Sequence, residues 1–267
     1  MKRGRLAAAL AVLLVAAFAA PGTFAATPTR APAMPGTRST AALRVAALSE
    51  HILKLQAQEG LRVLTPRGRR ASGTALRELD AAVRAVGVPA APAELHESAA
   101  LLAILAADYR AWALKPATRE NARKLAERAE EVAWEAQKVA RLSTGATRPG
   151  AALAARAEEA SALSQRVARL VLWKRWGVGG ASADNALALA RVELEAALRE
   201  LGAANGPSAE TLAELQLAEN QVAFLLASAR RIEEGAREGR ELEFAAKASD
   251  NARESLERLA ALYDGGP

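Results

Sequence analysis

Apolar residues recur at helical spacing along most of the chain, and two matching segments, 47–55 and 162–170, show the pattern best. The apolar positions are Leu48, Ile52 and Leu55 in the first segment and Leu163, Val167 and Leu170 in the second. In each segment they are separated by four and then three positions, which places them on one face of a helix. No segment shows the sustained alternation of β-branched residues that indicates strands. The chain is therefore predicted to be all-α.

The two segments belong to a longer match, in which 47–87 aligns without a gap with 162–202 at a shift of 115 positions. At that shift 13 of 41 positions are identical, although five of these are Ala in an Ala-rich chain. The apolar positions also match, and both stretches end on a glycine, Gly87 and Gly202. The match predicts a helical unit of about 110 residues that occurs twice.

Turn-forming residues divide each copy into four amphipathic segments. The first copy, 39–142, is expected to have helices at 39–65, 72–86, 92–115 and 118–142, with a basic loop at 68–70. The second copy, 151–264, is expected to have helices at 151–176, 181–201, 208–234 and 241–263, after a linker at 143–150. Each copy is expected to close as an up-and-down antiparallel four-helix bundle. The prediction is two tandem bundles.

The first 26 residues have the organisation of a secretory signal peptide. Lys2, Arg3 and Arg5 precede an apolar run at 6–20, which is followed by Pro, Gly and small residues. The alternative, an uncleaved anchor, is disfavoured because the run is short for a membrane span. Residues 27–38 contain three prolines and are expected to form a flexible leader. The mature chain is therefore expected to be periplasmic or secreted, without a membrane span.

Two stretches also carry a resemblance to a known family. The run Leu-Ser-Gln-Arg-Val-Ala-Arg-Leu at 163–170, followed by a Trp-containing turn, resembles the opening helix of the PilJ-type domain. That domain is the N-terminal sensor region of type IV pili methyl-accepting chemotaxis proteins. The segment 248–264, Ala-Ser-Asp-Asn-Ala-Arg-Glu-Ser-Leu-Glu-Arg-Leu-Ala-Ala-Leu-Tyr-Asp, is similar to the family's closing helix. The resemblance implies a sensory module in two tandem copies, and the match is closer in the second copy. Any signal is expected to pass to a separate partner.

The amino-acid composition limits the cofactors and partners that this chain can be expected to have. The chain has no cysteine, which excludes disulfides, thiolate catalysis, iron–sulfur clusters and covalently attached haem, and no cofactor is expected. The formal net charge is +6, but the predicted signal peptide supplies three of the basic residues. The remaining arginines alternate with acids along helix faces, which does not indicate a nucleic-acid partner.

No arrangement of residues predicts an enzyme or a metal site. His51 and His96 are the two histidines, and neither has the neighbours of a haem or metal ligand, so solvated helix positions are expected for both. The chain has no Gly-x-Ser-x-Gly motif and no phosphate-binding loop, and the glycines at 177–180 are interpreted as a helix stop. Adjacent acids such as Glu158 and Glu159 diverge on a helix and are expected to be solvated.

Anion recognition is the chemistry that the resemblance implies. In the PilJ-type family, an arginine-rich segment just ahead of the Leu-Ser-Gln-Arg pattern is associated with anion sensing at a helix pair, often across a dimer. Here Glu159 and Ser161 occupy those places in the second copy, and Arg44 and Ala46 occupy them in the first. Arg44 and Glu159 are also equivalent in the repeat, and could meet if the copies pack as an internal pseudo-dimer. The hypothesis is therefore that symmetric nitrate binding is lost.

Two functions remain open. The first is a sensory or ligand-binding module for a small anion or metabolite, acting as a homodimer or an internal pseudo-dimer. The second is a helical adaptor that contacts a protein of the cell envelope. Candidate ligand-binding residues are Arg44, Ser49, His51, Ser164, Gln165, Arg166 and Arg169. The basic cluster at 166–175 is either part of a ligand site or, alternatively, a solvated helix face. Trp173 and Trp176 are candidate partner contacts or, alternatively, plugs at the ends of thin bundles.

Overall fold

The computed structural model describes residues 38–87, 92–143, 150–204, 207–235 and 239–265. Within them it has eight α-helices and no strand, which confirms the all-α prediction. The predicted signal peptide, nearly all of the leader and most of the linker lie outside the described residues. The helices are α1 (Arg38–Gly60), α2 (Pro66–Val86), α3 (Ala93–Ala113), α4 (Arg119–Leu142), α5 (Ala151–Trp176), α6 (Gly180–Gly202), α7 (Ala209–Glu233) and α8 (Gly239–Gly265).

The helix boundaries agree with the predicted ones to within two residues, except between α1 and α2. Helix α1 ends at Gly60 rather than at residue 65. Helix α2 differs at its start. This helix begins at Pro66 rather than at residue 72, so the predicted basic loop at 68–70 is wrong and those residues are helical. The hydroxyl of Thr65 accepts a hydrogen bond from the Gly68 N–H at 3.1 Å and caps the helix. Pro66 fits the first turn because that position needs no N–H donor.

The glycines after α5 end that helix, as predicted. Gly177 has φ +74° and Gly179 has φ +93°, both in the left-handed region that favours glycine. The Val178 N–H reaches back to the Trp173 carbonyl at 2.9 Å, which closes the helix end. The chain then turns directly into α6.

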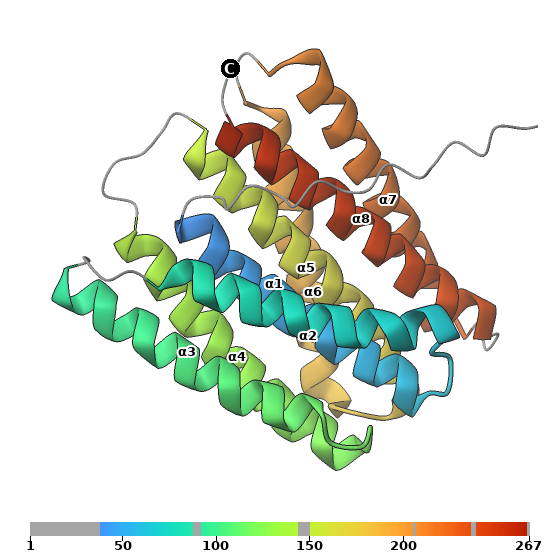
Figure 1. Cartoon of the computed structure of the whole chain (residues 1–267). Coiled ribbons are helices and arrows are strands. Elements are labelled where there is room, and N and C mark those ends of the chain that lie inside the picture. The colour runs from blue at the N-terminus through green and yellow to red at the C-terminus, as the bar shows by residue number, and fades with distance from the viewer. Residues whose placement is uncertain (1–37, 88–91, 144–149, 205–206, 236–238, 266–267) are drawn as a thin grey trace, which may run out of the picture. The chain divides into compact units, whose positions relative to one another are not determined.

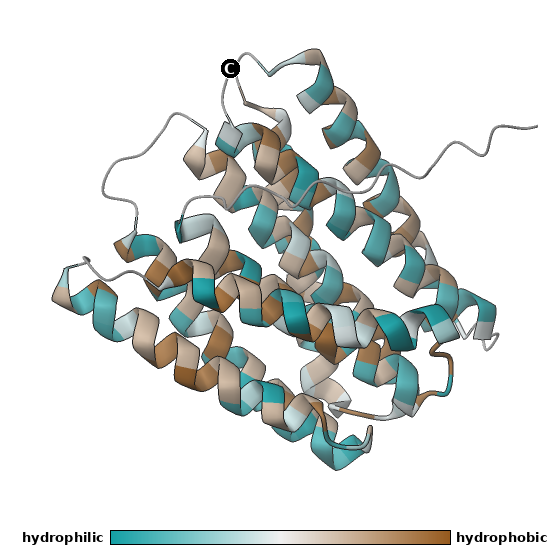
Figure 2. Cartoon of the chain, viewed as in Figure 1, coloured by the Kyte–Doolittle hydropathy of each residue, from teal (hydrophilic) through white to brown (hydrophobic). Residues whose placement is uncertain are grey.

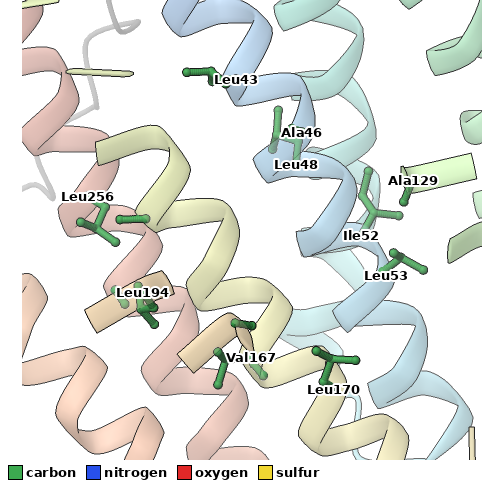
Figure 3. Packing of buried hydrophobic residues seen from close by; sticks show 14 of the residues in the cluster. Leu43, Ala46, Leu48, Ile52, Leu53, Ala129, Val167, Leu170, Leu194 and Leu256 are labelled. Atoms are coloured by element: carbon green, nitrogen blue, oxygen red, sulfur yellow. The ribbon is translucent and has the colours of Figure 1, made fainter. Parts of the chain in front are cut away.

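Two helices, α1 and α5, lie at the centre of the described residues. Helix α1 packs against α2, α4 and α5, and α5 packs against α1, α6 and α8 (Figure 1). Helices α3 and α7 lie outermost, on α4 and α8 respectively. Figure 3 shows apolar side chains of the central pair, including Leu48 and Leu170, within the buried cluster. No helix among the described residues is both long enough and apolar enough to cross a membrane.

The burial pattern repeats between the two halves. At the 115-residue shift the four buried residues of α2 all fall on buried residues of α6. At a shift of 120 the nine buried residues of α4 all fall on buried residues of α8. Equivalent helices therefore bury equivalent faces, which is the pattern that a duplicated unit produces.

The central position of α1 has a chemical consequence. It buries 19 of its 23 residues, so its polar side chains cannot all face solvent. Polar residues that alternate with apolar ones along the helix are visible in Figure 2. Buried polar groups need hydrogen-bond or charge partners to offset lost hydration. For Glu50, His51 and Lys54 those partners come from α5 and α8.

Candidate functional site: the polar seam between the central helices

Most of the predicted ligand-binding residues lie in a polar seam, which we define as the buried polar side chains between α1, α5 and α8. Ser49, His51, Ser164, Gln165 and Arg169 are all less than 9% exposed. The two serines are used locally, because each hydroxyl donates to the carbonyl three residues earlier, at 2.7 and 2.8 Å. The side chains available for recognition are therefore the charged and amide groups.

Glu50 is the centre of the first cluster. Its carboxylate accepts from Arg166 Nε and from Arg169 Nε, each at 2.8 Å. Burial alone would raise the pKa of Glu50, but the charges and hydrogen bonds of the two guanidiniums more than offset it, so the pKa lies below its ordinary value. Arg169 is also stacked 4.5 Å from the ring centroid of Trp173. The Glu50 carboxylate thus neutralises Arg166 and Arg169, which were predicted to bind an anion.

The contact between Glu50 and Arg166 has an equivalent at the corresponding positions of the repeat. At the 115-residue shift Gln165 corresponds to Glu50 and Arg166 corresponds to His51. The contact between Glu50 and Arg166 therefore has a counterpart between Gln165 and His51, and the structure shows it, with His51 Nδ1 at 2.9 Å from Gln165 Oε1. Reciprocal contacts of this kind are the signature of a two-fold interface.

The hydrogen bonds of Gln165 define the state of His51. Gln165 Nε2 donates to the Ser249 carbonyl at 2.6 Å, so Oε1 faces His51 and His51 Nδ1 must carry the proton. Burial, and then the charge of Lys54, lower the pKa of His51 to about 3. The solvated position expected for this histidine is wrong: it is 3% exposed and neutral. His96 is exposed, as expected.

Lys54 is buried completely and forms the third polar contact of the seam. Its ammonium donates to Asp250, to the Ser249 hydroxyl at 3.1 Å and to the Ala246 carbonyl at 3.3 Å. Burial lowers the pKa of Lys54, and the charge of Asp250 offsets part of that effect. Three acceptors around one ammonium satisfy its donors.

Arg44 lies at one end of the seam, among acids. It donates to Glu257 at 2.9 Å and lies 3.9 Å from Glu158. Glu159, the residue that the repeat placed opposite Arg44, is instead paired with Arg156 at 2.8 Å. Burial, together with the charge of Glu257, raises the pKa of Glu158 to about 8. The solvated position expected for Glu158 is wrong, because this side chain is 2% exposed.

The seam thus contains cations that are already paired with carboxylates. Among the described residues no three His, Cys, Asp or Glu side chains are grouped so as to hold a metal ion.

The two tryptophans predicted as partner contacts, Trp173 and Trp176, are 6% and 8% exposed. A Cβ added at Gly60 would lie 2.0 Å from the Trp176 ring, so this indole packs directly on the end of α1. Their burial fits the packing interpretation.

Sequence reasoning missed Glu50, Lys54 and Asp250, which are the partners that complete the seam. A signal was present, because α1 carries apolar residues on every side of the segment that includes Glu50 and Lys54. A helix that is apolar all round is buried, so its charged residues must be paired. No family model, curated protein or solved structure matches the chain.

Proposed function

We propose that the chain is an exported, non-enzymatic sensory or ligand-binding module of the PilJ-like type, in which two four-helix units form a pseudo-dimer within one chain. The observation that carries this proposal is the reciprocal pair of contacts in the seam. Glu50 meets Arg166 and Gln165 meets His51, as two copies related by a two-fold axis would. The repeated burial pattern supports the same origin.

The seam of this pseudo-dimer has lost the symmetry that an anion site needs. Arg166 and Arg169 are bound to Glu50, and Arg44 is bound to Glu257. An anion entering between α1 and α5 would have to displace these carboxylates, which are themselves buried. Nitrate is therefore not the expected ligand, and any signal is expected to pass to a separate envelope protein.

A thermal-shift screen of small anions and metabolites tests the proposal. A compound that binds the folded state raises the melting temperature by mass action, and isothermal calorimetry then gives its affinity. Submillimolar nitrate binding that is lost in Arg44→Ala would contradict the assignment of the seam. A response to no compound at all would contradict the ligand-binding function itself.

The second candidate function, a helical adaptor, is favoured by exposed apolar side chains on α6, α7 and α8. Leu189 and Val192 on α6, Phe224 on α7 and Phe244 on α8 are each at least half exposed. Scattered exposed apolar residues are common on folded proteins, so they support this function less strongly than the seam supports the first. Capture of one defined envelope protein, lost on Phe224→Ser, would favour the adaptor.

A further inference from the structure

A hollow of about 370 Å³ lies on the outer surface of α3 and α4, and we name it the α3–α4 groove. It is lined by Leu101, Leu105, Glu130, Glu131, Trp134 and Glu135. Apolar residues are visible along α3 in Figure 2. The indole of Trp134 is 62% exposed, although the other described tryptophans are at least partly buried. An exposed Trp beside carboxylates is a combination that suits an apolar cation.

Glu135 sets this groove apart from a solvated acidic face. Its side chain is 1% exposed, and its Oε1 has no hydrogen-bond partner among the described residues. A buried carboxylate oxygen without a partner costs free energy that a bound donor would recover. Glu131 lies one turn earlier on the same helix, at the same groove. Glu130 also lines the groove. The pKa of Arg166 is raised chiefly by the charge of Glu50, and the charge of Glu130 makes a smaller contribution in the same direction.

The second half of the chain provides an internal comparison. At the 120-residue shift that relates α4 to α8, positions 131, 134 and 135 correspond to Asn251, Glu254 and Ser255, and these three line a second hollow between α7 and α8. There Asn251 and Ser255 have partners within the protein. Asn251 donates to Gln221 at 3.1 Å, and Arg258 donates to Ser255 at 3.2 Å. The protein supplies its own cation at one groove, whereas the buried oxygen at the other is unpaired.

We propose that the α3–α4 groove binds a small organic cation, an ammonium group carrying an apolar chain. The ammonium donates to Glu135 and is attracted by Glu131, and the chain lies on Leu101, Leu105 and the face of Trp134. The volume of the hollow is within the range of small-molecule sites. This inference rests on the proposed ligand-binding function and names the chemical class of the ligand.

Calorimetry of the purified protein with n-hexylammonium tests the inference, with n-hexanol and hexanoate as uncharged and anionic comparisons. Saturable binding of the amine alone is expected. Glu135→Gln keeps the shape of the side chain and removes its charge, so binding should weaken about tenfold to a hundredfold. Trp134→Ala should weaken it about tenfold. Glu127→Gln, an exposed acid on the same helix outside the groove, is the matched control and should leave the affinity unchanged.

Three results would overturn the inference. If hexanol bound as tightly as the amine, the site would not recognise charge. If Glu135→Gln left the affinity for the amine unchanged, the buried carboxylate would not contact the ligand. Concentration-dependent dimerisation that protects Trp134 from quenching would make the groove a self-association surface. Failure of the amine to bind, when another compound of the thermal-shift screen does bind, would refute the groove and leave the proposed function standing. Circular dichroism of each variant checks that it is folded.

Discussion

The pairing of Glu50 with two arginines makes a quantitative prediction about stability. Replacing Glu50 by Gln keeps the size of the side chain and removes the negative charge that Arg166 and Arg169 share. The Arg166 side chain is 33% exposed and can rehydrate, but that of Arg169 is 8% exposed and would remain as a buried cation without its counter-charge. The stability loss should therefore come mainly from Arg169.

Removing one partner of a buried ion pair typically costs about 3–5 kcal/mol. For a chain of this size that corresponds to a fall in melting temperature of roughly 6–20 °C. Urea denaturation followed by circular dichroism at pH 7 would measure the change in the free energy of unfolding. The double variant Glu50→Gln, Arg169→Met removes the stranded cation and should recover a large part of the loss.

Glu158→Gln is a matched control, because it makes the same chemical change in the same seam with the opposite expected sign. The pKa of Glu158 is raised to about 8, so the folded protein keeps this carboxyl protonated at pH 7 whereas the unfolded chain ionises it. Wild-type stability therefore falls as pH rises from about 4.5 to about 8, by roughly 3 kcal/mol at pH 7. Glu158→Gln removes that loss and should stabilise the protein increasingly over this range.

Glu50 has the opposite pH dependence. In the folded protein the pKa of Glu50 lies below its ordinary value. The ionised carboxylate therefore stabilises the folded state above the unfolded-state pKa, and this stabilisation is lost as pH falls through the folded-state pKa. The two Glu→Gln variants should therefore diverge with rising pH. If Glu50→Gln changed the unfolding free energy by less than about 1 kcal/mol, the range of a surface pair, the description of the seam as a buried charge network would be refuted.

Three further changes test the packing and polar contacts around the seam. Gly60→Ala places a methyl group against Trp176 and should lower stability by about 1–3 kcal/mol, as measured by urea denaturation. Tyr109→Phe removes a 2.6 Å hydrogen bond to the backbone of α1 and should cost about 1 kcal/mol in the same assay. Asp250→Asn strands the fully buried ammonium of Lys54, whereas Lys54→Met leaves a carboxylate that is 36% exposed, so Asp250→Asn should lower the melting temperature more.

The sequence predicted the helices well because their ends carry explicit signals. Thr118 and Ser208 cap α4 and α7 through hydrogen bonds to the N–H groups of Asn121 and Thr211, and Gly177 ends α5 in the left-handed region. Where the prediction of α2 was wrong, Pro66 and Gly68 were interpreted as part of a loop. The Thr65 cap and the proline at the first helical position outweighed them.

The seam was predicted only in part, because helical periodicity describes one apolar face and α1 has several. His51 was assigned to solvent since it lies beside the Leu48 and Ile52 face, but α5 packs on that side and Asp250 of α8 lies 3.4 Å from the imidazole. Glu158 was assigned to solvent because it and Glu159 are adjacent acids that diverge on a helix, but the structure buries Glu158. Tertiary packing decides which polar residues of a central helix are buried, and periodicity within one helix contains no information about it.

The two halves of the seam show how a duplicated interface can diverge. If the copies began identical, positions 50 and 165 held the same residue and positions 51 and 166 held the same residue. One contact is now charged, between Glu50 and Arg166, and its counterpart is neutral, between Gln165 and His51. A neutral Gln cannot compensate the cation at position 54, so Lys54 takes its counter-charge from Asp250 on α8. This asymmetry fixes the identity of each half, because exchanging the two central helices would separate Lys54 from Asp250 on α8.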